Sequence, residues 1–169
     1  MWNSERLIEE QIPRLRRYAR ALTSDAVRAD DLVQDTLERA WSKFSLWRRG
    51  SDLRAWLFTI MHNVYVNQVT AAGARHEWLP LDDDALEVPV EADQERALEM
   101  RDLVSALNQL PPDYREVLLL VGLEELRYEE VAKVMNVPIG TVMSRLSRGR
   151  ERLRRLMAGE AAPVLRRVK

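Results

Sequence analysis

The chain has no cysteine, only two histidines and no long hydrophobic run, and each shortage excludes a class of protein. Without thiols there is neither a disulfide framework nor a thiolate metal site, and the histidine spacing suggests no metal site, so we expect no cofactor. The longest apolar run, residues 117–121, is much shorter than the roughly eighteen residues that span a bilayer, so we expect no membrane insertion. The charged N-terminus lacks the apolar part of a signal peptide, so we expect a cytoplasmic protein.

Charge is distributed unevenly along a chain that is nearly neutral overall. The 169 residues are 46% hydrophobic, which suits one or two small helical domains. The net charge is −1, yet residues 145–169 contain nine basic and two acidic side chains, whereas residues 71–96 contain eight acidic and two basic ones. Because affinity for nucleic acid depends on local Lys and Arg, the C-terminal part remains a candidate DNA-binding region.

Residues 128–156 have the pattern of a helix-turn-helix. Apolar residues at helical spacing predict a short helix over residues 128–135 and a longer helix that starts near Ile139. Between them, Asn136 tolerates the left-handed conformation that ends a helix, and Pro138 suits the first turn of the next one.

The second of these helices has an apolar stripe and an opposite polar side. The polar side carries hydroxyls and guanidinium groups, which can reach base edges and phosphates in a DNA major groove. A solvated basic face on an ordinary bundle helix is the alternative, but the tight break before the helix favours DNA binding. The stripe consists of Val142, Leu146, Gly149, Leu153 and Leu156.

The first half of the chain predicts three helices, over about residues 4–22, 27–41 and 52–69. Pro13 should kink the first helix or divide off its first turns. On the second helix, Asp31, Gln34 and Asp35 share an acidic face with Glu38. That face is either simply solvated or a docking surface for a basic partner.

Between the second and third helices, aromatic residues alternate with cations. Phe44 and Trp47 stand among Lys43, Arg48 and Arg49. Unpaired bases stack on aromatic rings with about 1–3 kcal/mol per base, while cations bind the phosphates, so the loop suits a melted DNA strand. The alternative is that both aromatic residues belong to the core.

The third helix combines a predicted buried stripe with a polar flank. Asp52 is a good N-cap, and Trp56, Asn63 and Asn67 form a row that can stack on and hydrogen-bond to base edges. A buried Trp beside two solvated Asn residues is equally natural. The stripe consists of Leu53, Leu57, Ile60, Met61 and Val64.

Residues 71–95 have the acidic, proline-containing composition of a flexible linker. Two support helices follow, and Asp113 with Glu116 has the spacing of a capping box at the start of the second one. The predicted fold is therefore all-α, with two small helical domains, 1–70 and 96–169, joined by the acidic linker. No constellation of side chains marks an active site, so we do not expect an enzyme.

Four segments together resemble the extracytoplasmic-function (ECF, group IV) bacterial sigma factors. They are DDLVQDTLERAW at 30–41, DLRAWLFTIMHNVYVN at 52–67, LPPDYREVLLL at 110–120 and YEEVAKVMNVPIGTVMSRLSRGRERLRRL at 128–156. Their order and spacing match the family over nearly the whole chain.

The resemblance implies a transcription initiation factor that binds core RNA polymerase and directs it to promoters. It assigns Asp31, Gln34 and Asp35 to the clamp of the β-prime subunit. It assigns later arginines of the last helix to phosphate or the β flap. It also implies an anti-sigma factor as a further partner. The minus-10 contacts would be Phe44, Trp47, Arg48, Arg49, Trp56 and Asn63, and the minus-35 contacts Thr141, Ser144, Arg145 and Arg148.

Two questions remain open at the level of sequence. Met143 stands where the family often has Lys or Arg, so the promoter preference can differ at this position. The arrangement of the two lobes in the free protein is not determined. The rival interpretation is a helix-turn-helix activator or repressor that binds duplex DNA without joining polymerase, but no heptad seam for a dimer is present, and the acidic helix and aromatic loop would then lack a purpose.

Overall fold

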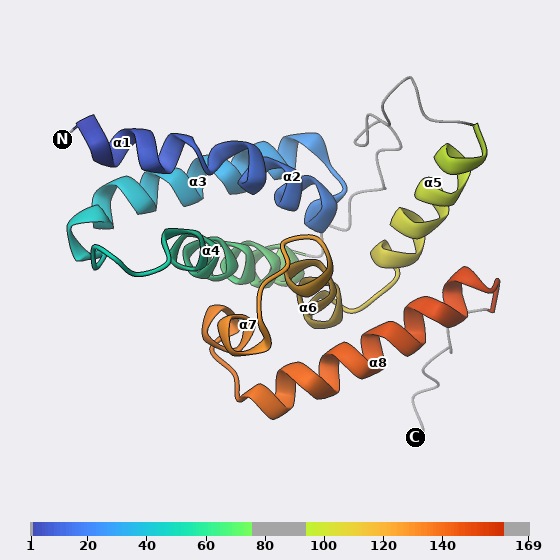
Figure 1. Ribbon diagram of the computed structural model, residues 1–169. Helices are drawn as coiled ribbons and strands as arrows, with labels where there is room; N and C mark the ends of the chain where they lie inside the picture. Colours follow the sequence, from blue (N-terminus) through green and yellow to red (C-terminus); the bar gives the residue numbers. More distant parts are fainter. Residues whose placement is uncertain (1, 76–93, 161–169) are drawn as a thin grey trace.

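The structure, a computed structural model, describes residues 2–75 and 94–160, and all regular elements in these ranges are helices (Figure 1). The predicted all-α fold with two helical domains is confirmed. None of the described helices is long and apolar enough to cross a membrane. The elements are α1 (Trp2–Glu9), α2 (Ile12–Thr23), α3 (Ala26–Lys43), the 3-10 turn η1 (Phe44–Leu46), α4 (Leu53–Arg75), α5 (Gln94–Asn108), α6 (Pro112–Gly122), α7 (Tyr128–Met135) and α8 (Ile139–Met157).

The first lobe begins with two helices, α1 and α2, where the apolar pattern of the sequence predicted one helix over about residues 4–22. A short break separates α1 from α2, and Pro13 lies in the first turn of α2, where its missing amide is not needed. The prediction for Pro13 is confirmed. Ser24 then turns the chain with a left-handed backbone (φ 52°). Asp25 caps α3, because its carboxylate accepts hydrogen bonds from the amides of Val27 (2.9 Å) and Arg28 (3.1 Å).

The longest described helix, α4, is buried over more of its surface than the sequence pattern predicts. Asp52 caps it as expected, accepting a hydrogen bond from the amide of Ala55 (3.2 Å). The predicted stripe packs inward, and Phe58 and Tyr65 are buried as well. The helix runs on through Arg75, five residues into the segment 71–95 that composition assigns to the linker. Three alanines in that stretch favour helix. Most of the predicted linker lies outside the described residues.

The second lobe contains the predicted helix-turn-helix. α7 ends at Met135, and Asn136 takes the left-handed conformation (φ 54°) with its amide directed to the carbonyl groups of Ala132 and Lys133. Pro138 precedes α8, which starts at Ile139. These local features confirm the predicted boundaries of both helices.

Gly149 sets how closely α8 approaches α6. A β-carbon built on this glycine would lie 3.3 Å from the β-carbon of Tyr114 and 3.4 Å from the side chain of Leu118. A larger residue would push the two helices apart. The close approach fixes the inner face of α8 and leaves its opposite face outward.

The two lobes pack against each other. Buried side chains of both lobes belong to one continuous hydrophobic cluster. Figure 1 shows α4 between α3 and α7, and both pairs of helices are in contact. The lobes are therefore docked in this structure, which answers a question that the sequence leaves open.

Arg115 on α6 joins the ends of two other helices. Its guanidinium donates hydrogen bonds to the carbonyl oxygens of Leu107 (2.9 Å), Asn108 (2.9 Å) and Leu110 (3.0 Å), at the end of α5. It also donates to the carbonyl of Leu22 (3.2 Å), at the end of α2. Terminal carbonyls lack partners within their own helix, so one side chain from the second lobe stabilises a helix end in each lobe.

The predicted capping box is wrong. α6 begins at Pro112 with Pro111 as its N-cap, and no side chain caps it. Glu116 cannot reach back to the helix start because it lies on the inner face of α6, where it is buried. The spacing of Asp113 and Glu116 is therefore coincidental.

Candidate nucleic-acid and partner interfaces

The acidic face of α3 has an exposed part and a supported part. Asp31 and Gln34 are exposed. Asp35 is half-buried, and its carboxylate accepts a hydrogen bond from the side-chain amide of Gln68 on α4 (3.1 Å). Gln34 lies near Glu38 on its own helix (3.4 Å). The structure thus places all three predicted docking residues on one helix, with only Asp35 tied to the fold.

Beside this face, a groove of about 620 Å³ runs between α2 and α3. Its lining combines cations of α2 with apolar side chains and acids of α3, so a partner helix would meet apolar and charged groups together. The sequence reading included Gln34 but missed the groove, because it depends on how two helices pack. Its lining is Arg16, Arg20, Asp30, Val33, Gln34, Leu37, Glu38 and Trp41.

The aromatic residues after α3 form a cluster with the first turn of α4. The ring centroids of Phe44 and Trp47 lie 5.4 Å apart, and Phe44 meets Trp56 edge-on at 6.3 Å. All three residues are half-buried. The indole nitrogen of Trp47 is buried and has no hydrogen-bond partner among the described residues. The rings are therefore compatible with both interpretations from the sequence, core residues and a surface for unpaired bases, since each ring contributes to packing and keeps some exposed surface.

Cations and an amide lie near this cluster in the chain. Arg48 and Arg49 are exposed in the loop, and Asn63 is exposed two turns after Trp56 on α4. Residues seven apart share one side of a helix, so Trp56 and Asn63 face the same way. The structure thus joins Phe44, Trp47 and Trp56 in one cluster, with Asn63 on the same side of α4 as Trp56 and two exposed arginines next to Trp47 in the chain.

The predicted DNA contacts on α8 differ in exposure. Ser144 and Arg148 are exposed, and Thr141 is half-buried. Arg145 is turned toward α6, where its guanidinium lies 3.6 Å from the carboxylate of Asp113 and its side chain is 25% exposed. Ser144 and Arg148 therefore occupy the open part of the helix, and Arg145 its edge.

Several later arginines of α8 already have partners within the chain. Arg152 lies over the ring of Tyr114, 5.2 Å from its centroid. Arg154 and Arg155 both pair with Glu151, at 2.8 Å and 3.2 Å. The two pairs with Glu151 are exposed and weak, so Arg154 and Arg155 can exchange them for phosphate.

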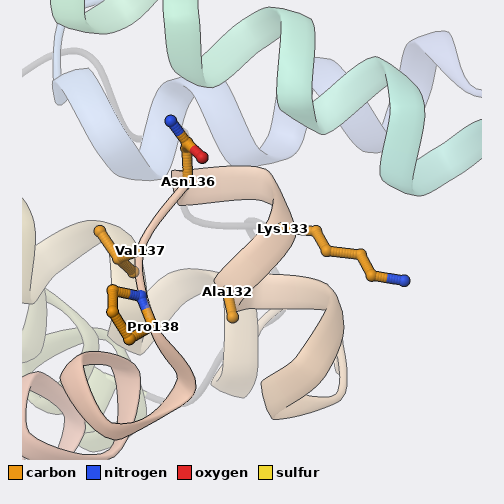
Figure 2. A pocket seen from close by; sticks show the side chains of 5 residues that line it. All are labelled: Ala132, Lys133, Asn136, Val137 and Pro138. Atoms are coloured by element: carbon orange, nitrogen blue, oxygen red, sulfur yellow. The ribbon is translucent and has the colours of Figure 1, made fainter.

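The turn between α7 and α8 forms a shallow hollow of about 360 Å³ (Figure 2). Its lining is mixed, and Figure 2 shows the ammonium group of Lys133 directed away from the turn. The hollow is lined by Ala132, Lys133, Asn136, Val137 and Pro138.

His62 on α4 and Glu116 on α6 form a buried pair between the lobes that sequence reasoning missed. Nδ1 of His62 lies 2.7 Å from a carboxylate oxygen of Glu116, and their side chains are 12% and 2% exposed. Burial raises the pKa of Glu116, and the hydrogen bond from His62 opposes that rise. Neither residue has a sequence signal for this contact, because their helices are far apart in the chain.

Glu124 is a second buried carboxylate at the lobe interface. Its side chain has no exposed surface, and it lies 3.1 Å from the guanidinium of Arg17 and 3.8 Å from that of Arg14, both on α2. Its backbone carbonyl accepts a hydrogen bond from Arg54 on α4 (3.1 Å). Three guanidinium groups of the first lobe thus converge on one residue of the second.

In the ranges 2–75 and 94–160, no group of three or more His, Cys, Asp or Glu side chains could hold a metal ion. The candidate interfaces are the acidic α3 face, the aromatic loop and the outer face of α8. They consist of charged and aromatic surface, which is suited to binding macromolecules.

Two protein-family models match the chain, one in each lobe. The Sigma2 domain of PhyR matches residues 8–62, and Sigma-70 region 4 matches residues 100–153. Together with the helix-turn-helix and the docked helical lobes, these matches define a two-domain transcription factor of the sigma type.

Similar proteins specify the group. The chain is 38% identical over 152 residues to the ECF RNA polymerase sigma factor EcfG of Rhodopseudomonas palustris, covering 89% of this chain and 83% of that protein. It is 30% identical over 146 residues to the ECF RNA polymerase sigma factor SigM of Bacillus subtilis, covering 83% and 86%. Among solved structures, the sigma factor RpoE in complex with the anti-sigma factor NepR, from Bartonella quintana, is 35% identical with a TM-score of 0.77, covering 95% of this chain and 100% of that one.

The chain belongs to the ECF RNA polymerase sigma factors. It is an initiation factor that directs RNA polymerase to promoters, as the sequence resemblance implies. Membership of this family excludes the alternative of a helix-turn-helix activator or repressor that works without polymerase.

Proposed function

We propose that the two lobes divide promoter recognition, with the first lobe (1–70) binding polymerase and the minus-10 element and the second (96–169) binding the minus-35 element. The supporting observation is that three chemically different surfaces are exposed on one docked fold. These are the acidic face of α3, the aromatic loop beside α4, and the outer face of α8. Each suits a different part of a polymerase–promoter complex.

The acidic face of α3 binds the β-prime clamp. Asp31 and Gln34 are open to a partner, and Asp35 is held in place by Gln68. A charged rim with an apolar floor is the usual composition of a stable protein interface, and the groove beside α3 has both. Leu37 and Trp41 in that groove would carry the apolar part of the binding.

The aromatic loop and the outer side of α4 hold the melted minus-10 strand. A base can stack on the exposed parts of the rings, the arginines can bind phosphate, and the amide of Asn63 can read a base edge. The residues concerned are Phe44, Trp47, Arg48, Arg49, Trp56 and Asn63.

The outer face of α8 enters the major groove of the minus-35 element. Ser144 and Arg148 make the direct contacts, because they are the exposed members of the set. Thr141 and Arg145 lie at the edge of this face. On binding, the guanidinium of Arg145 leaves the carboxylate of Asp113 and contacts DNA instead. The arginines beyond Arg148 bind phosphate or the β flap.

The protein acts as a subunit of polymerase rather than as a catalyst of its own, and it works in the cytoplasm, where polymerase and chromosome meet. An anti-sigma factor is its regulator. The similar RpoE of Bartonella quintana is in complex with such a protein, NepR, which supports this partner.

The test is transcription by purified core polymerase from a supercoiled promoter library, with and without the full-length chain. We expect a set of transcripts that depends on the protein. The absence of such transcripts, together with tight binding of the protein alone to duplex DNA, would refute the proposal.

Matched variants assign the three surfaces. Asp31→Arg should weaken association with core polymerase, Trp47→Ala should slow promoter opening, and Arg148→Ala should weaken minus-35 recognition with core binding intact. Glu129→Ala, on an exposed side of α7, is the control and should change none of these. A variant that impairs all three steps alike would show a structural role instead.

A further inference from the structure

The first turns of α8 expose an apolar edge that the assignments above do not use. Ile139 is 43% exposed and Met143 is 53% exposed. Side chains four residues apart lie next to each other on a helix, so Ile139, Met143 and Ser147 form one row along α8. Ser147 is also exposed. The row is therefore open to solvent on the outer half of the helix.

The backbone beside this row is equally open. A β-carbon built on Gly140 would meet no atom within 4 Å. In helix-turn-helix proteins, the residues near the start of the second helix are those that contact base edges. Ile139, Gly140 and Met143 occupy that position, whereas Arg145 is held at the inner edge by Asp113.

An apolar side chain in the major groove has one suitable target. Each base pair presents hydrogen-bond donors and acceptors there, and thymine alone adds a methyl group. Methionine forms only weak hydrogen bonds but fills irregular apolar space well. We propose that Met143, flanked by Ile139, is a specificity-determining residue that contacts the 5-methyl group of a thymine in the minus-35 element.

The charges around the edge favour DNA over a protein as its partner. Arg148 and Arg150 are exposed on α8 and form no ion pair with any residue in the described ranges. Arg150 follows Met143 by seven residues and so lies on the same side of the helix. Arg148 lies farther around the helix, so the outer surface of α8 has a cation on each side of Ser144. One cation beside the apolar row and another across the outer surface match a groove that has methyl groups inside and phosphates at its two rims. The inference rests on the proposed placement of α8 in the minus-35 element.

The experiment uses the full-length chain with core polymerase and a promoter selected from the library. Each thymine of the minus-35 element, on either strand, is replaced singly by deoxyuridine, which removes only the methyl group. We expect one or two of these changes to weaken promoter binding about three- to fivefold, the effect of burying one methyl group. Met143→Leu, which stays apolar, should retain this sensitivity, and Met143→Gln should lose it.

Met157 provides the matched control, because it is also exposed on α8 (44%) but lies at the opposite end. Met157→Gln should keep the full response to deoxyuridine. The inference is overturned if the selected element has no thymine, if no replacement weakens binding, or if Met143→Gln responds as the unchanged protein does. A Met143→Gln variant that loses core binding instead would assign the edge to polymerase and also overturn it. In all these outcomes the unchanged protein still gives protein-dependent transcripts, whereas failure of the proposed function removes them.

Discussion

The two sides of α4 serve different purposes, although they belong to one helix. On one side, Arg54 and His62 bind the second lobe, and Phe58 meets Tyr18 of α2 edge-on with ring centroids 5.0 Å apart. On the other side, Asn63 is exposed, and no described residue of the second lobe covers it. Lobe docking and the proposed DNA capture therefore involve separate residues of α4, so each can be changed without the other.

The largest expected effect is at the centre of the packed side. Phe58→Ala should lower the free energy of unfolding by about 3–5 kcal/mol, because it removes a buried ring and leaves a cavity. Urea unfolding measures the loss. Val66→Ala on the same helix is the control, since Val66 is 41% exposed, and it should change stability by less than about 0.5 kcal/mol. Equal losses would show that burial at Phe58 is not the source of the effect.

A smaller effect is expected where the second lobe is tied to the first. Glu124→Ala should lower stability by roughly 1–3 kcal/mol, because two guanidinium groups lose their buried partner but are themselves half-exposed and regain water. Small-angle scattering should show a larger radius of gyration as the lobes separate. Glu10→Ala, which breaks the exposed pair with Arg6, should alter neither quantity. An unchanged radius would mean that the remaining contacts between the lobes hold them together without Glu124.

The pair between Glu116 and His62 should make docking sensitive to pH. Burial raises the pKa of Glu116, so its contribution to stability is complete below the ordinary value of 4.5 and declines as the pH rises through the raised pKa. Arg145 opposes this rise in the pKa and Asp113 adds to it. Glu116→Gln should flatten that decline in unfolding experiments across the same window. A decline as steep as that of the unchanged protein would exclude Glu116 as its source.

The smallest effect on stability is expected on the outward side. Asn63→Ala should leave the free energy of unfolding within about 0.5 kcal/mol of the unchanged protein, because its side chain is exposed. It should nevertheless slow promoter opening in the transcription assay. A clear loss of stability would show that Asn63 supports the fold.

Local features of the sequence predicted much of the fold. The break at Asn136 and Pro138, the cap Asp52, and the division at Pro13 each depend on a few neighbouring residues, and the backbone follows them. The cap Asp25 is equally local, but it was not predicted from the sequence. Such signals need no knowledge of distant contacts.

Contacts between helices could not be predicted in the same way. The position of Glu116 three residues after Asp113 suggests a helix cap, but its side chain is buried. Its hydrogen-bond partner, His62, comes from another helix, α4. Phe58 and Tyr65 fall outside a single apolar stripe, because α4 is packed from two directions. A pattern along one helix identifies one buried side, whereas a second buried side depends on a partner elsewhere in the chain.

The docked lobes also limit the reach of the protein. The names of the minus-35 and minus-10 elements give their positions, which differ by about 25 base pairs. This separation corresponds to about 85 Å along B-form DNA. A compact chain of 169 residues has a radius of gyration of about 15 Å, which corresponds to a diameter of about 40 Å. One docked body cannot touch both elements. Under the proposed division of promoter recognition between the lobes, the contacts at Glu116 and Glu124 must therefore break, and part of the binding energy of polymerase and DNA is used to separate the lobes.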